Sequence, residues 1–409
     1  MAFPPVDEQL HVIKRGVVDL LPEEELIKKI ENSIKMNKPL IIKQGFDPTA
    51  PDIHLGHTVG LRKLKQFQDL GHKVVVIIGD YTAMVGDPSE RNSTRPRITH
   101  AEVMKHAQTY KEQFFKILEP AKTQIRYNGQ WFSKMTFDQI MELAAKFTVA
   151  RMLERDDFAK RYINQLPISI HEFFYPLMQG YDSVMIDADV ELGATEQKFN
   201  LVIARQIQKE YGKEQQIVLT LPVLEGIDGT QRMSKSLGNY IGIDEPPNEI
   251  YGKVMSIPDT LIYPYFELVT DVSLNELLEI KNQLEDKNKN PRDTKKHLAY
   301  TITRMYYDKD QAKQAKLEFE RIFVQKKIPQ QIQDFTLAEL SYRLDELLVN
   351  TKTAASKSEA RRLIEQGGVT IDGNKIADPF TEISLRQEII LKVGKRKYLK
   401  VRSNNSESD

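Results

Sequence analysis

The stretch LIIKQGFDPTAPDIHLGHTVGLRKLKQFQDLGHKVVVIIGD, residues 40 to 80, decides the fold. It contains two apolar runs, at 40–42 and 74–78, and glycine and aspartate follow each run within a few positions. Such short apolar runs are typical of strands buried in a parallel sheet. Between them, apolar residues recur at near-helical spacing from residue 57 to residue 70. Strand, helix and strand in this order predict a doubly wound α/β sheet.

The α/β pattern continues well beyond this stretch. A helical segment near 198–211 precedes another strand candidate, IVLTLPVLEG at 217–226. From residue 246 to about 307 the apolar spacing is helical, with a polar break at 288–291, which predicts an all-helical region. Residues 328–337 have the composition of a linker.

Composition limits the chemistry that the chain can perform. It has 409 residues, no cysteine and a formal net charge of zero. Disulfides, thiolate nucleophiles and cysteine-ligated zinc are therefore excluded. The N-terminal segment lacks the features of a targeting peptide, and no window approaches about eighteen apolar residues, so we expect a cytoplasmic protein with no membrane segment. A neutral chain would bind nucleic acid through a local basic patch.

The motif HLGH, residues 54–57, lies where a loop after the first strand becomes a helix. Ligands of doubly wound sheets bind beyond the carboxyl ends of the strands, and a helix N-terminus there attracts phosphate. His54 and His57 share one face of the first turn, and Gly56 leaves no side chain to block a flat ring, which fits adenine and phosphates. A metal pair or two surface histidines would give the same spacing, but no third ligand is evident nearby, so we expect no metal site.

The motif RMSKS, residues 232–236, follows the last predicted strand in the glycine-flanked segment DGTQRMSKSLGN. The segment indicates a mobile loop that carries a lysine, although RMSKS alone is more simply a solvated basic turn. Together and in this order, HLGH and RMSKS resemble the HIGH and KMSKS signatures of class I aminoacyl-tRNA synthetases. Arg232 stands where the signature has a lysine, which keeps the charge but changes its shape.

This resemblance implies an enzyme that activates an amino acid with ATP. The amino-acid carboxylate attacks the α-phosphorus in line, so the protein supplies positioning and positive charge and needs no nucleophile of its own. The resemblance implies that His54 and His57 contact ATP and the transition state, that Lys235 neutralises pyrophosphate, and that Mg²⁺ accompanies ATP. The other implied ATP contacts are Gly56, Ser236, Gly193, Glu196, Arg91 and Arg95. A solvated basic loop explains Arg91 and Arg95 equally well.

A polar stripe in the segment HEFFYPLMQGYDSV, residues 171–184, bears on the choice of amino acid. Tyr175, Gln179 and Asp182 are spaced i, i+4, i+7 and would share one face of a helix among apolar neighbours. We interpret the stripe as pocket lining, with an amphipathic surface as the alternative. With GFDPTAPD at 45–52, DYTAMVGDPS at 80–89 and TVARMLERDDF at 148–158, it resembles the tyrosyl-tRNA synthetases over nearly the whole chain.

The second resemblance implies roles for the residues around tyrosine. Asp182 would accept the hydrogen bond of the substrate phenol, and phenylalanine would leave this carboxylate unpaired. Asp87, Tyr175 and Gln179 would hold the ammonium group, with Gln197 also near the amino acid. A helix cap before Pro88 is the structural alternative for Asp87.

Three further positions, besides Arg232, depart from the family pattern. Lys43 stands where the commonest form of the family has a second phenol that recognises tyrosine, so the phenol end of the pocket would use other partners. Ala194 and Glu196 replace a glycine and an aspartate that contacts the ribose, and Glu196 would have to reach the same hydroxyl with a longer side chain. A tryptophan-specific relative and a non-catalytic RNA-binding paralogue are the rival functions.

The segment LDELLVNTKTAASKSEARRLIEQGGVTIDGNKI, residues 344–376, predicts two short helices, a tight turn and a hairpin strand. It resembles the S-four-like RNA-binding module. Its basic side chains suit phosphate contacts, with an ordinary solvated helix face as the alternative. The candidate RNA-binding residues are Lys352, Lys357, Arg361 and Arg362.

The expected organisation is an α/β chain with a doubly wound, Rossmann-like catalytic domain, an all-helical domain and a small α+β domain. The boundaries are 1–38 for a helical segment, 39–245 for the catalytic domain, 246–340 for the helical domain on the anticodon side, 343–402 for the S-four-like domain and 403–409 for a disordered tail. The resemblance implies a tyrosine–tRNA ligase whose partners are tyrosine, ATP and tRNA-Tyr, and which forms a homodimer.

Overall fold

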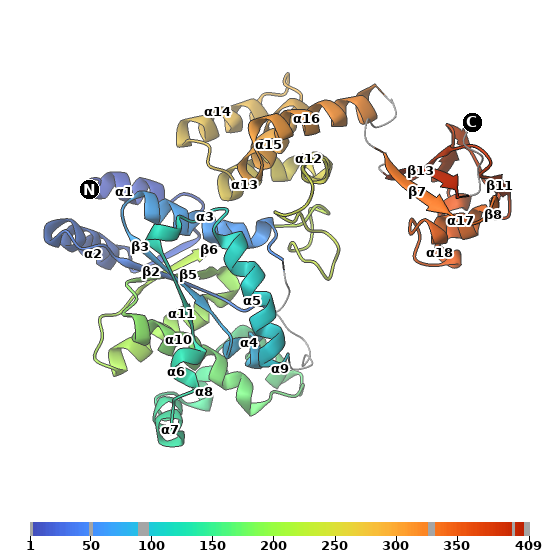
Figure 1. Ribbon diagram of the computed structural model, residues 1–409. Coiled ribbons are helices and arrows are strands. Elements are labelled where there is room, and N and C mark those ends of the chain that lie inside the picture. The colour runs from blue at the N-terminus through green and yellow to red at the C-terminus, as the bar shows by residue number, and fades with distance from the viewer. Residues whose placement is uncertain (1–2, 49–51, 89–97, 326–331, 395–396, 405–409) are drawn as a thin grey trace. The chain divides into compact units, whose positions relative to one another are not determined.

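The computed structural model describes residues 3–48, 52–88, 98–325, 332–394 and 397–404 (Figure 1). The chain divides into two compact units, Met1–Lys316 and Leu317–Asp409. In the described ranges, no helix is both long enough and apolar enough to cross a lipid bilayer.

A six-stranded sheet forms the centre of the first unit. Its strands are β1 (Asp19–Leu21), β2 (Ile41–Phe46), β3 (Lys73–Ile78), β4 (Thr123–Tyr127), β5 (Val190–Ala194) and β6 (Ile217–Leu221). They lie in the order β1-β6-β5-β2-β3-β4. All neighbours from β6 to β4 pair in parallel, while β1 runs antiparallel to β6. The predicted doubly wound sheet is confirmed, and its apolar strands β3 and β6 are buried almost throughout.

Helices lie on both faces of this sheet (Figure 1). The helix α3 (Leu55–Asp69), predicted at 57–70, packs on β2, β3 and β5. The helices α10 (Phe174–Ile186) and α11 (Lys198–Glu210) pack on each other and on β2, β5 and β6. The remaining helices of this region are α1 (Val6–Ile13), α2 (Glu23–Met36), α4 (Thr82–Val85), α5 (His100–Phe114), α6 (Gly129–Phe132), α7 (Phe137–Ala145), α8 (Val149–Met152) and α9 (Asp156–Ile163).

The region from Pro247 to Phe319 is helical, as the periodicity from residue 246 indicated. It contains α12 (Pro247–Ser256), α13 (Ile262–Val269), α14 (Leu274–Glu285), α15 (Pro291–Tyr306) and α16 (Lys309–Phe319). The polar break at 288–291 separates α14 from α15. Pro291 takes the first helical position of α15, and the side chain of Asn290 caps it by accepting a hydrogen bond from the backbone of Arg292.

The second unit combines two short helices with a five-stranded sheet. Its elements are β7 (Gln333–Leu337), β8 (Ser341–Arg343), α17 (Leu344–Asn350), α18 (Lys357–Glu365), β9 (Val369–Ile371), β10 (Asn374–Lys375), β11 (Glu382–Ser384), β12 (Ile389–Val393) and β13 (Lys397–Ser403). The sheet order is β10-β9-β12-β13-β7, and β8 pairs with β11. Asp372 and Gly373 form the predicted tight turn with positive φ of 46° and 85°, which suits a two-residue hairpin.

Three local expectations differ from the structure. Residues 1–38 contain the edge strand β1 as well as helices. The expected linker at 328–337 includes β7, which pairs in parallel with β13, and Ser403, assigned to a disordered tail, is the buried last residue of β13. Short polar strands show no hydrophobic alternation, so the sequence pattern does not indicate them. They are recognised only from their pairing with other strands in the structure.

Candidate active site

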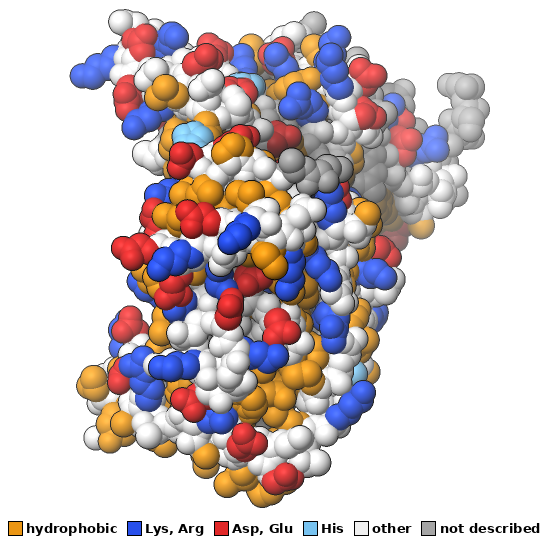
Figure 2. Space-filling view, turned by 90° about the vertical axis from the view of Figure 1, so that its left-hand side faces the viewer, with side chains coloured by type: hydrophobic (Ala, Val, Ile, Leu, Met, Phe, Trp, Pro, Cys, Tyr) orange, Lys and Arg blue, Asp and Glu red, His pale blue; other side chains and the backbone are white. Residues whose placement is uncertain are grey.

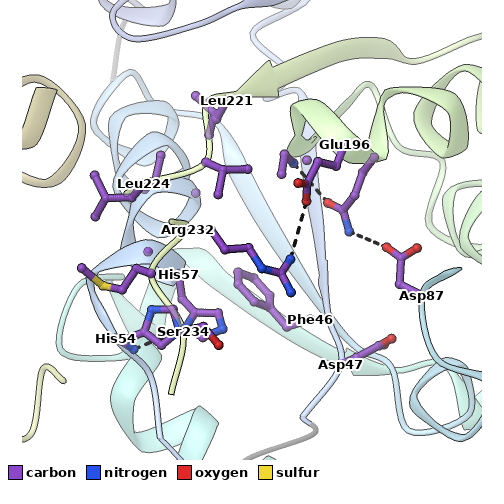
Figure 3. A pocket seen from close by; sticks show the side chains of 18 of the residues that line it. Phe46, Asp47, His54, His57, Asp87, Glu196, Leu221, Leu224, Arg232 and Ser234 are labelled. Carbon is purple, nitrogen blue, oxygen red and sulfur yellow. Dashed lines mark hydrogen bonds and ion pairs between the residues drawn. The ribbon is translucent and has the colours of Figure 1, made fainter. Parts of the chain in front are cut away.

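A cavity of about 490 Å³ opens at the carboxyl ends of β2, β5 and β6. Its wall combines the start of α3, Asp87 after α4, Tyr175 on α10, the residues after β5 and the loop that carries RMSKS (Figure 3). The predicted residues that line it are His54, Gly56, His57, Asp87, Tyr175, Gly193, Glu196, Gln197, Lys235 and Ser236. Two motifs that are far apart in the sequence therefore meet at one cavity.

The two histidines of HLGH are held against each other at the start of α3. His54 precedes the first helical residue, and its backbone N–H donates to Nδ1 of His57 over 3.3 Å. The ring centroids are 4.0 Å apart. A Cβ added to Gly56 would come within 3.0 Å of the His54 ring, so the space that glycine leaves is used in part by His54 itself.

Both histidines are neutral at physiological pH. Burial, together with the charges of His57 and Lys235, lowers the pKa of His54 to about 2. Burial and the charge of Lys235 lower the pKa of His57 to about 4. Nδ1 of His57 accepts a hydrogen bond, so its proton sits on Nε2, and Nδ1 of His54 is buried without a partner among the described residues. The histidines therefore offer hydrogen bonds, and positive charge at the cavity must come from elsewhere.

The lysine loop supplies that charge. Met233 is buried and anchors the loop, and the side chain of Asn239 accepts from the backbone N–H of Ser234 over 2.8 Å. Nζ of Lys235 lies 2.8 Å from Oδ2 of Asp52, which precedes HLGH. Arg232 reaches across the cavity to Glu196, with 3.7 Å between Nη1 and Oε2 (Figure 3). Two of the departures from the family pattern, Arg232 and Glu196, thus face each other across the cavity.

A set of carboxylates forms the side of the cavity opposite the lysine loop. Arg155 donates to Oδ1 of Asp87 over 2.9 Å, and the side-chain amide of Gln197 donates to Oδ2 over 3.1 Å. The hydroxyl of Tyr175 donates to Oδ2 of Asp47 over 3.0 Å. Burial and the neighbouring carboxylates of Asp47 and Asp87 raise the pKa of Tyr175 well above its usual value, so its phenol keeps its proton. This wall is anionic and suits an ammonium group.

The other two residues of the polar stripe, Gln179 and Asp182, follow Tyr175 along α10, behind the cavity. Asp182 is buried and accepts hydrogen bonds from Nε1 of Trp131 over 2.9 Å and from Nδ2 of Asn128 over 3.3 Å. Burial raises the pKa of Asp182 to about 7, although these two hydrogen bonds and the charge of Lys43 lower it. Gln179 donates to Glu191 over 2.9 Å. Tyr175 and Asp182 are buried and Gln179 is half-buried, so the stripe forms one largely buried face of α10, and Tyr175 is the member that lines the cavity.

Sequence reasoning missed several residues that complete the site. They are Asp47, Asp52, Asn128, Trp131, Arg155 and Glu191. Asp47 and Asn128 each follow a strand of the parallel sheet, so the rule that ligands bind at carboxyl ends could have found them. The contacts of Arg155 and Trp131 depend on tertiary structure and leave no local signal. Arg91 and Arg95 lie outside the described residues.

The candidate RNA-binding residues of the second unit differ in their surroundings. Lys352 and Arg362 are exposed. Lys357 pairs with Glu346 over 2.7 Å, and Nε of Arg361 lies 2.9 Å from the buried carboxylate of Asp345. Arg361 therefore contributes to the packing between α17 and α18, which leaves Lys352 and Arg362 as the better candidates for contact with an external phosphate.

Comparison with known proteins identifies the family. The model of class I tRNA synthetases (W and Y) matches residues 35–324, and that of the tyrosine–tRNA ligase SYY-like C-terminal domain matches residues 319–401. The chain is 52% identical to tyrosine–tRNA ligase of Moorella thermoacetica over 396 residues, which are 97% of this chain and 96% of that one. It is 52% identical to that of Thermotoga maritima, with 97% of each chain covered.

A solved structure shares the fold. The tyrosyl-tRNA synthetase of Archaeoglobus fulgidus, complexed with L-tyrosine, matches 76% of this chain and 100% of its own length with a TM-score of 0.62 and 22% identity. At this identity the match supports the fold alone. The family assignment rests on the two relatives that are 52% identical to this chain over nearly its full length. The chain therefore belongs to the tyrosine–tRNA ligases, within the class I tRNA synthetases.

Proposed function

We propose that the cavity between HLGH and the lysine loop joins tyrosine to ATP, giving tyrosyl-adenylate and pyrophosphate, and that the tyrosyl group then passes to the 3′ end of tRNA-Tyr. The convergence of His54, His57 and Lys235 on one cavity, in a chain of this family, carries the proposal. A carboxylate oxygen of tyrosine forms a bond to the α-phosphorus while the bond from that phosphorus to the α–β bridging oxygen breaks, so pyrophosphate leaves with the bonding electrons. In the transfer step a hydroxyl of the terminal ribose of tRNA attacks the tyrosyl carbonyl carbon, and AMP leaves.

ATP fits the half of the cavity formed by α3 and the lysine loop. The N-terminus of α3 favours the phosphates, Lys235 and Arg232 bring positive charge to pyrophosphate, and the neutral histidines donate hydrogen bonds where charge develops. Gly56, Gly193 and Ser236 line the same space, and Glu196 is the residue that would reach the ribose. Mg²⁺ would enter as the counter-ion of ATP, bound by phosphate oxygens and water, since the described residues contain no group of three or more histidine or acidic side chains placed to hold a metal.

Tyrosine fits the anionic half. Asp87, Tyr175 and Gln197 line this wall with carboxylate, phenol and amide groups, and we assign them to its amino group together with Gln179, which lies behind the wall on α10. The phenol would point along α10 toward Asp182. A ring without a hydroxyl would leave that buried carboxylate without a donor from the substrate, which is unfavourable.

The test is ATP–pyrophosphate exchange with tyrosine, tryptophan and phenylalanine measured in parallel. We expect exchange that depends on tyrosine. Exchange with tryptophan alone would establish the rival specificity, and no exchange with any of the three, in a protein that still binds tRNA, would establish the non-catalytic paralogue.

The second unit supplies the surface that we assign to tRNA. Replacing both Lys352 and Arg362 by alanine should raise the KM for tRNA about tenfold. It should also reduce the slope of the logarithm of tRNA affinity against the logarithm of salt concentration by about two, because each phosphate contact releases counterions. ATP–pyrophosphate exchange, which needs no tRNA, should stay unchanged. The control is Lys35→Ala with Lys38→Ala, which removes two exposed charges near α2. Equal effects of the two double variants would contradict a specific surface.

A homodimer is the assembly that the exposed apolar side chains of the first unit support. Many of these side chains lie between residues 137 and 170. Figure 2 shows hydrophobic side chains at the lower end of the molecule, where Figure 1 places α7 and α8. Those between residues 137 and 170 are Phe137, Met141, Val149, Tyr162, Ile163, Leu166 and Ile170. Large apolar patches on soluble proteins mark interfaces, and a chain of zero net charge does not repel a second copy.

Charged substitutions in this patch should separate the subunits. Phe137 and Ile170 are 77% and 78% exposed, so replacing both by aspartate leaves the fold intact and should convert a dimer into a monomer in light scattering. Met36→Asp on α2, at 71% exposure, is the matched control and should remain dimeric. A wild-type chain that is monomeric at micromolar concentration would refute the assignment.

A further inference from the structure

The centre of the first unit contains a buried ion pair. Lys43 on β2 and Glu191 on β5 are both 0% exposed, and 2.8 Å separates Nζ from Oε1. Removing two charges from water costs free energy, and apolar residues of similar volume are often at least as stabilising as a buried pair. The pair is therefore weak evidence for stability, and its neighbours indicate what else it does.

Lys43 binds the helix turn that carries Asp182. Besides Glu191, its ammonium donates to the backbone oxygen of Gln179 over 2.7 Å and to Oγ of Ser183 over 2.8 Å. All three donors of the ammonium group are used. Gln179 and Ser183 lie on either side of Asp182 in α10. The lysine therefore fixes the position of this helical turn along the sheet and its rotation about the helix axis.

Glu191 orients the side chain of Gln179. It accepts from Nε2 of Gln179 over 2.9 Å and from Oγ of Ser183 over 3.1 Å, and Gln216 also donates to it. Oε1 of Gln179 accepts from Asn200 on α11 over 2.9 Å. The amide therefore has one orientation, with its nitrogen toward Glu191 and its oxygen toward Asn200.

The same pair sets the charge environment of Asp182. Lys43 from β2 and Glu191 from β5 are the charged groups that act on it, whereas Trp131 on α6 and the preceding Asn128 face it as neutral donors. Lys43 lowers the pKa of Asp182 and Glu191 raises it, with the lysine the larger of the two influences. Burial raises the pKa of Asp182, against the effect of the lysine, and it has the largest effect of all.

We propose that Lys43 and Glu191 are positioning residues for tyrosine recognition: they fix the turn of α10 that carries Gln179 and Asp182, and the lysine charge keeps Asp182 an acceptor for the substrate phenol. The inference rests on the proposed reaction. In this arrangement a buried cation supports the recognition of tyrosine indirectly, without touching the substrate.

The experiment measures the ratio of kcat/KM for tyrosine to that for phenylalanine between pH 6 and pH 9. In this ratio, ionisations at the ATP half of the cavity cancel, because they affect kcat/KM for both amino acids equally. The wild-type ratio should rise with pH, because ionised Asp182 accepts the phenol hydrogen. Glu191→Gln removes the opposing charge and should move this rise to lower pH. Lys43→Met with Glu191→Gln removes both charges, avoids an unpaired buried carboxylate, and should move the rise to higher pH with a loss of about tenfold at pH 7.

Opposite shifts in the two variants distinguish a positioning role from a merely structural one. Lys63→Met is the matched control, since Lys63 is another buried lysine, bound to the backbone oxygens of Val12, Ile13 and Arg15. It should lower the unfolding temperature and leave the pH profile in place. Wild-type exchange with tyrosine but unmoved profiles in both Glu191→Gln and the double variant would overturn this inference alone. A wild type without tyrosine-dependent exchange would overturn the proposed reaction itself.

Discussion

Replacing Lys235 by alanine should lower kcat of ATP–pyrophosphate exchange by about 100- to 1000-fold, because it removes a preorganised charge from the site where pyrophosphate departs. The KM for tyrosine should stay within about twofold, since the amino-acid half of the cavity lies on the opposite wall. Lys235 also has a carboxylate partner, Asp52, so its side chain has a defined position before ATP arrives. Initial rates with ATP varied at saturating tyrosine, and with tyrosine varied at saturating ATP, measure both constants.

Two variants bracket the Lys235 result. Lys213→Ala removes an exposed lysine that pairs with Asp187 and does not line the cavity, and it should leave both constants unchanged. Lys235→Arg keeps the charge and should recover part of kcat, because a guanidinium is larger and less well matched to this position. An alanine variant with wild-type kcat would show that Arg232 alone neutralises pyrophosphate.

Replacing Asp182 by asparagine should abolish most of the preference for tyrosine over phenylalanine. The amide has nearly the same shape and can still accept from Trp131, but it lacks the charge that makes the phenol a favoured donor. We expect kcat/KM for tyrosine to fall about 100-fold and that for phenylalanine to change by less than about threefold. Exchange rates with each amino acid over a range of concentrations measure both values.

The same variant should be more stable than the wild type above neutral pH. The folded-state pKa of Asp182, about 7, is above its unfolded value, so the folded chain binds this proton more tightly and its stability falls as pH rises toward 7. Asparagine does not titrate, so the unfolding temperatures should differ at pH 8 and converge near pH 4. Asp187→Asn, at the left-handed end of α10, is the control and should alter neither selectivity nor this pH dependence. Unchanged discrimination in Asp182→Asn would place phenol recognition elsewhere.

The sequence predicted those parts of the molecule that rest on local periodicity. The apolar runs of β2 and β3, with α3 between them, carry their hydrophobic pattern within about forty residues, and a parallel sheet brings their carboxyl ends together. His54, His57 and Lys235 were found because a helix N-terminus and a glycine-flanked loop after a strand have recognisable sequences. Their meeting at one cavity follows from the order of the strands.

The partners of the predicted residues could not be found in the same way. Asp182 contacts Trp131 and Asn128, which are more than fifty residues away, and nothing near Trp131 indicates that its indole donates to a carboxylate. Lys43 lies in an apolar strand, where a lysine is usually a sign of an exposed edge, and its burial is explained by Glu191 on the neighbouring strand and by two oxygen acceptors on α10. The neutrality of His54 and His57 likewise depends on burial that the sequence does not report.

The strand order also determines at what point during translation the central sheet and its cavity can be completed. Asp19 of β1 pairs with Thr220 of β6, 201 residues later, and β5 joins β2 only after α10 has been made. A nascent chain that ends before β5 holds β2, β3 and β4, with the edge of β2 open in addition to the permanent edge at β4, and it has no partner for β1. Pairing across such long separations is slow and leaves edges open to other chains. The proposed site for tyrosine and ATP is therefore complete only after the lysine loop has been synthesised, and until β5 is made the edge of β2 has no strand partner.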